Sequence, residues 1–68
     1  MSATATLYRA NAGRERDAAS QEVLANRQQM RERSALVWDE MAQRLEETER
    51  LAVRNATAKA ALSAAADA

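Results

Sequence analysis

The stretch SALVWDEMAQRLEETERLAV, residues 34–53, decides the fold because it holds the only dense set of large apolar side chains in this 68-residue chain. On a helix that turns by about 100° per residue, its apolar side chains fall within one arc and its charged side chains occupy the other side. The arc contains Val37, Trp38, Met41, Leu45, Thr48 and Ala52. The stretch therefore predicts an amphipathic helix with one apolar stripe.

Helix-forming residues extend well beyond this stretch. The chain has no Pro and a single Gly, and Ala, Arg, Glu, Gln and Leu dominate it. Pro and Gly are the residues that most disfavour a helix, whereas the dominant residues are strong helix formers. We expect an all-α protein with one long amphipathic helix over residues 14–55. A bend or a helical hairpin is the alternative, with Ser34 and Asn55–Thr57 as the places where a new helix could be capped.

The two ends of the chain differ from this central helix. Residues 1–13 are expected to form an N-terminal arm, extended or loosely helical, because Asn11 and Gly13 tolerate turn conformations. Leu7 and Tyr8 in the arm are candidate anchors for a partner, and a frayed terminus is the alternative. Residues 56–68 are expected to form an Ala-rich helical tail with one large apolar residue, Leu62.

The chain has few large apolar residues from which to build a core. Of its 32 hydrophobic residues, 18 are Ala and only 14 are larger. A chain of this size is marginally stable even with a well-filled core. We therefore expect oligomerisation or docking on a larger body to order it.

A seven-residue repeat supports this expectation. Val23, Met30, Val37 and Leu51 share one heptad position, which Arg44 interrupts, and Met41 and Leu62 share the position four residues later. Such spacing allows two helices to wind together, although the polar residues in the seam predict weak pairing. The predicted interface consists of Val23, Met30, Val37, Trp38, Met41, Leu45, Thr48 and Ala52. Trp38 is either its hot spot or an ordinary core residue of a small bundle.

Charge gives a weaker indication of partners. Ten basic and ten acidic residues cancel, which disfavours a general binder of nucleic acid. On one continuous helix, Arg16, Arg27 and Arg31 would project within about 60° of one another. They are candidate anion contacts, and a solvated face is the alternative.

The sequence predicts no enzyme. It has no Cys and no His, which removes common nucleophiles, bases and metal ligands. Adjacent acidic residues such as Asp39 and Glu40 diverge on a helix and cannot share a site. We expect no catalytic residue, metal, cofactor or small-molecule substrate. No apolar run approaches the roughly 20 residues of a membrane span, and no signal peptide is apparent. We expect a cytoplasmic origin, with incorporation into a particle as an option.

These observations favour a non-catalytic structural or adaptor subunit whose partner is itself or a larger protein assembly. In composition the chain resembles minor helical subunits of virions and secretion machines. Two alternatives are a small helical regulator or inhibitor that docks its Trp38 stripe on a target protein, and a nucleic-acid accessory protein.

Overall fold

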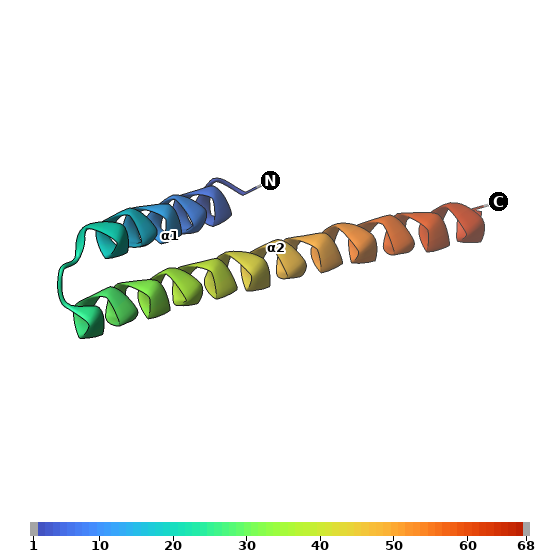
Figure 1. Cartoon of the computed structure of the whole chain (residues 1–68). Helices are drawn as coiled ribbons and strands as arrows, with labels where there is room; N and C mark the ends of the chain where they lie inside the picture. Colours follow the sequence, from blue (N-terminus) through green and yellow to red (C-terminus); the bar gives the residue numbers. More distant parts are fainter. Residues whose placement is uncertain (1, 68) are drawn as a thin grey trace.

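The chain folds into two antiparallel helices of unequal length. A computed structural model describes residues 2–67. Helix α1 spans Ala3–Gln21 and helix α2 spans Ala25–Asp67, and the two lie side by side (Figure 1). The molecule measures 67 × 16 × 10 Å. The all-α prediction is confirmed, and the arrangement is the hairpin alternative rather than one long helix.

Helix α1 begins immediately after Ser2, because this residue caps it. The Ser2 hydroxyl oxygen accepts hydrogen bonds from the backbone N–H groups of Thr4, at 3.1 Å, and Ala5, at 3.4 Å. An N-cap of this type satisfies donors that a helix start leaves free. The expected boundary between an arm and a helix at residue 13 is corrected, because α1 continues through Gly13. A single Gly weakens a helix but does not end it when the helix packs on a neighbour.

Replacing Gly13 by Ala is expected to stabilise the hairpin by about 0.5–1 kcal/mol, since Ala restricts the unfolded chain and favours the helix. A Cβ atom at this position would meet nothing within 4 Å, and the residue has no positive φ angle. Urea unfolding followed by circular dichroism would measure the gain. A destabilised Gly13→Ala variant would mean that α1 is not helical at this residue.

The chain reverses at residues 22–24, which contain neither Gly nor Pro. Glu22 ends α1 in an extended conformation, and its N–H donates to the carbonyl oxygen of Ala19 at 3.2 Å. Beyond Leu24 the side-chain oxygen of Asn26 accepts from the N–H of Arg27 at 2.9 Å. The proposed helix breaks at Ser34 and Asn55–Thr57 both lie within α2. The continuous helix expected over residues 14–55 is therefore corrected to two helices.

Alanines form the whole buried core of the described residues. The buried side chains are Ala5, Ala12 and Ala19 of α1 and Ala35 and Ala42 of α2, each at most 3% exposed. Each set repeats every seven residues, so each forms a straight seam along its helix. Small side chains allow two helix backbones to approach closely. At roughly 0.8 kcal/mol for each methyl-sized group, the five side chains contribute only about 4 kcal/mol.

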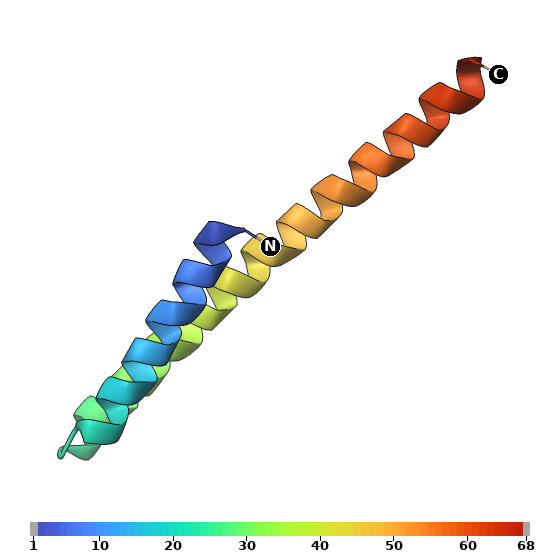
Figure 2. The same cartoon turned by 90° about the horizontal axis from the view of Figure 1, so that it is seen from above.

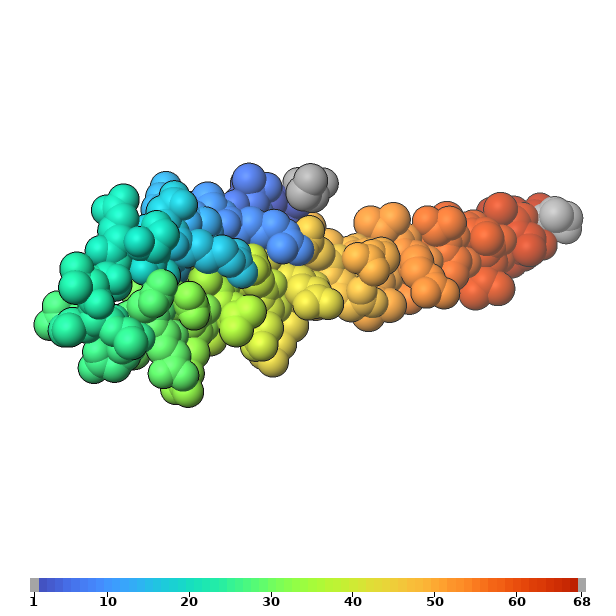
Figure 3. Space-filling view, viewed as in Figure 1, coloured from blue at the N-terminus to red at the C-terminus, as the bar shows by residue number. Residues whose placement is uncertain are grey.

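The last part of α2 projects beyond α1 as a single helix. Residues 50–67 are all exposed. The orange and red segment in Figures 2 and 3 therefore has no neighbour. We refer to residues 50–67 as the projecting tail. An isolated helix of this length is marginally stable in water. Within residues 2–67, neither helix has a stretch apolar enough to cross a bilayer.

Candidate protein interface

Ion pairs along one side of the alanine seam connect α1 to α2. Arg9 contacts both Asp39, at 3.7 Å, and Glu46, and Arg16 also contacts Asp39. Two basic residues seven apart on α1 thus face two acidic residues seven apart on α2. Each pair is partly exposed and contributes modestly to stability, but together they favour the antiparallel register.

The opposite side of the seam combines charge with an aromatic contact. Arg31 of α2 contacts Glu15 at 3.2 Å and Glu22 at 3.7 Å. Further along, the rings of Tyr8 and Trp38 lie with centroids 5.5 Å apart and planes tilted by 41°. Tilted aromatic pairs at this separation are favourable. This side of the helix pair therefore combines ion pairs with an aromatic contact.

A second face of α2 carries large apolar side chains that α1 does not cover. We name this face the outer seam. Its apolar members are 37–73% exposed and keep the heptad spacing over about 48 Å of helix. They are Met30, Val37, Met41, Leu51 and Leu62, with Ser34, Arg44, Thr48, Asn55 and Ala58 between them.

The outer seam lies next to the face that contacts α1. Ser34, Val37 and Met41 each directly precede a residue that packs toward α1, namely Ala35, Trp38 and Ala42. Consecutive helical residues diverge by about 100°. Helix α2 therefore has two contact faces about 100° apart, and a neighbour on the outer seam would not displace α1.

The structure divides the predicted interface into three parts. Trp38 and Leu45 are half-buried within the hairpin, and Val23 is 96% exposed in the turn. The remaining residues are exposed on α2: Met30, Val37, Met41, Thr48 and Ala52. The single stripe that the sequence predicts is therefore not one surface, because α1 covers only one edge of it.

The two candidate anchors of the N-terminal segment point in different directions. Leu7 is 52% exposed, whereas Tyr8 packs on Trp38 of the same chain. Adjacent residues on a helix diverge in this way. Tyr8 thus has an internal role in the hairpin, and Leu7 stays free on the outer side of α1.

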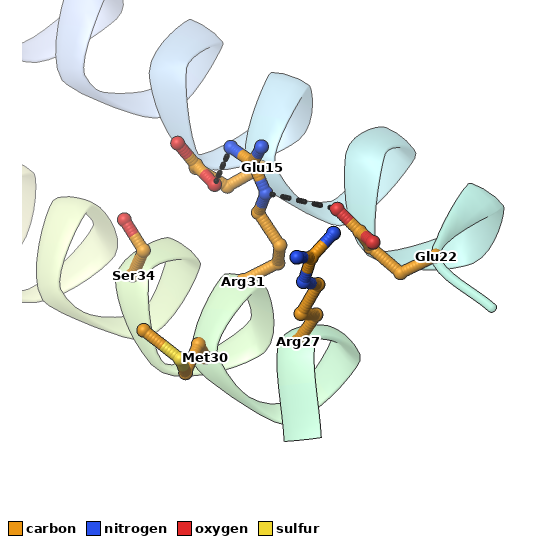
Figure 4. Close-up of a pocket in the computed structure, with 6 residues that line it drawn as sticks. All are labelled: Glu15, Glu22, Arg27, Met30, Arg31 and Ser34. Atoms are coloured by element: carbon orange, nitrogen blue, oxygen red, sulfur yellow. Dashed lines mark hydrogen bonds and ion pairs between the residues drawn. The ribbon is translucent and has the colours of Figure 1, made fainter. Parts of the chain in front are cut away.

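The three candidate anion contacts do not form one ridge. Arg16 lies on α1, whereas Arg27 and Arg31 lie on α2, and both Arg16 and Arg31 already contact carboxylates. Figure 4 shows Arg27 and Arg31 beside Glu15 and Glu22 in a shallow groove of about 400 Å³, which Met30 and Ser34 also line. Positive and negative charges alternate in this groove, so it presents no net basic surface.

The alanine seam is the feature that sequence reasoning missed. Its signal was present as the seven-residue recurrence of Ala5, Ala12 and Ala19, and again of Ala35 and Ala42. Alanine is also abundant throughout the chain, so its recurrence does not stand out as the spacing of large apolar residues does. Because this seam joins α1 to α2, it leaves the larger side chains of the outer seam for another partner.

The described residues contain no metal site, and no similar protein was found. Within residues 2–67, no cluster of three or more acidic side chains is placed to hold a metal ion. Comparisons of the chain with protein-family models, with curated proteins and with solved structures find no match.

Proposed function

We propose that the protein is a non-catalytic structural or adaptor subunit that joins a larger protein assembly through the outer seam of α2. A virion or another multi-subunit machine is an assembly of the expected kind. The observation that supports this most is the distribution of apolar side chains: the hairpin buries only alanines, while Met30, Val37 and Leu62 remain exposed on one face of α2. Apolar faces of this extent on small proteins commonly bind other proteins.

Replacing Val37 by Gln is expected to weaken association by about tenfold or more, because a buried Val contributes roughly 1.5 kcal/mol or more. Leu36 provides a matched control. It is adjacent and similarly exposed, at 57% against 54% for Val37, but it points away from the outer seam. Sedimentation of both variants over a range of concentrations, alone and with candidate partners, would measure the effect. Equal losses in Leu36→Gln and Val37→Gln would contradict the proposal.

A regulator that docks on one target protein is the second candidate. The half-buried Trp38 lies beside Met41 of the outer seam, so a groove on a target could contact both. A stable one-to-one complex with a single protein would favour the regulator, whereas an extended assembly would favour the subunit. A nucleic-acid accessory protein has less support than these two candidates, because Arg16 and Arg31 already form ion pairs with carboxylates of the same chain.

A further inference from the structure

We infer that the partner on the outer seam is a second copy of this chain, with its α2 antiparallel to the first. This inference rests on the proposed function and specifies it. In the resulting dimer, the projecting tail of each copy would lie along the hairpin of the other. Each half of the dimer would then contain three helices, namely α1, α2 and the tail of the second copy.

The lengths of the elements agree with this arrangement. Helix α1 has 19 residues, and the projecting tail comprises residues 50–67. Helix α2 runs from Ala25 to Asp67, so its midpoint is position 46. Antiparallel pairing about this midpoint would place the tail of one copy against residues 25–42 of the other. The tail of one copy, which α1 does not cover, would thus lie along the segment of the other copy's α2 that α1 packs against.

The same midpoint brings the outer seam into register with itself. Residues equidistant from position 46 would lie opposite each other, and the two heptad positions of the seam would alternate as an antiparallel coiled coil requires. The expected layers are Met30 with Leu62, Met41 with Leu51, Val37 with Asn55, Ser34 with Ala58, and Arg44 with Thr48. The layers of Met30 with Leu62 and of Met41 with Leu51, each of which occurs twice in the dimer, would join two large apolar side chains. No layer would join two charged side chains.

Charges beside the seam also favour the antiparallel direction. Glu40 of each copy would lie next to Arg54 of the other, and Arg44 would reach Glu47 of the second copy across the axis. A parallel pair would instead place Arg44 against Arg44 in the seam and Arg54 beside Lys59. Like charges in these positions oppose pairing.

The side nearest α1 can accept the tail of the second copy. Ala52 of the second copy would lie opposite Trp38, where a small side chain leaves room for the Tyr8–Trp38 pair. Like charges would meet in two places. Lys59 would lie opposite Arg31, which Glu15 and Glu22 already contact. The two Glu47 side chains would lie opposite each other at the axis, and each already contacts Arg50 of its own chain at 2.8 Å. The register therefore places no unbalanced charge at the junction of the three helices.

Disulfide cross-linking tests the direction and the register together. The chain has no Cys, so each engineered Cys is unique, and the substituted residues are exposed. A mixture of Met30→Cys and Leu62→Cys is expected to form a covalent dimer under mild oxidation. Each variant alone, and a mixture of Leu36→Cys with Leu62→Cys as the matched control, should form at least tenfold less. Sedimentation of the unmodified chain should give the mass of two chains.

Two results would overturn the inference. Efficient cross-linking of Met30→Cys with itself would indicate parallel pairing. A single-chain mass at every concentration, with no cross-link in any mixture, would exclude self-pairing. The assembly role would survive that second result if Val37→Gln, but not Leu36→Gln, lost binding to a different protein.

Discussion

Replacement of Ala12 by Leu is expected to open the helix pair. The Ala12 side chain has no exposed surface, and the seam that contains it depends on close approach of two backbones. Three additional carbon atoms at a packed position typically cost about 1–3 kcal/mol. That loss is comparable with the roughly 4 kcal/mol that the five buried alanines contribute. The Ala12→Leu hairpin should therefore lose much of its stability, so that open chains become populated at room temperature.

The contact between Tyr8 and Trp38 gives a direct measurement of this opening. Nuclear Overhauser effects between the two rings should disappear in Ala12→Leu and persist in Ala10→Leu, because Ala10 is exposed on the same helix. Both variants make the same change in helix propensity, so a fall in helicity by circular dichroism in Ala12→Leu alone would report the loss of packing between α1 and α2. Retention of the ring contacts in Ala12→Leu would refute a core that depends on alanine.

Replacement of Trp38 by Ala is expected to destabilise the hairpin by about 2 kcal/mol. Truncation of a fully buried Trp costs roughly 3–5 kcal/mol, and Trp38 is half-buried. Urea unfolding would measure the loss, and Trp38→Phe should retain part of the stability because it keeps an aromatic ring near Tyr8.

A double-mutant cycle separates the internal role of Trp38 from a role at another surface. Tyr8→Ala and Trp38→Ala should couple by about 0.5–1.5 kcal/mol, the range for an aromatic pair in contact. Additive effects on stability would mean that the two rings do not contact each other in solution. The measurement should be made at a concentration where the chain is monomeric, so that association does not contribute to the free energy of unfolding.

The sequence predicts the fold class well because helix formation here depends on composition. The absence of Pro and the abundance of Ala, Arg and Glu favour helix at nearly every position, and the structure follows this. The heptad spacing of Met30, Val37 and Met41 likewise predicts an apolar face on α2, and these three side chains are exposed in the hairpin. Both signals are local, so a single sequence contains them.

The position of the turn could not be predicted in the same way. Glu22, Val23 and Leu24 include no residue that ends a helix, whereas Gly13 and Asn55 look like breaks and lie within helices. The turn forms where it allows two alanine seams to meet, which is a tertiary effect. The same effect divides the Trp38 stripe, because α1 packs on Trp38 and leaves Val37 and Met41 exposed.

The unequal lengths of the helices have a consequence for backbone motion. Before Glu49, the amides of α2 belong to a helix supported by α1, whereas beyond it each turn of the projecting tail is held only by its own hydrogen bonds. Helical turns without tertiary support open with little free energy. In a single chain, backbone amides in the first half of α2 should therefore exchange hydrogen slowly, and those in the projecting tail should exchange rapidly. A partner that covers the tail would slow exchange there and make the whole helix rigid.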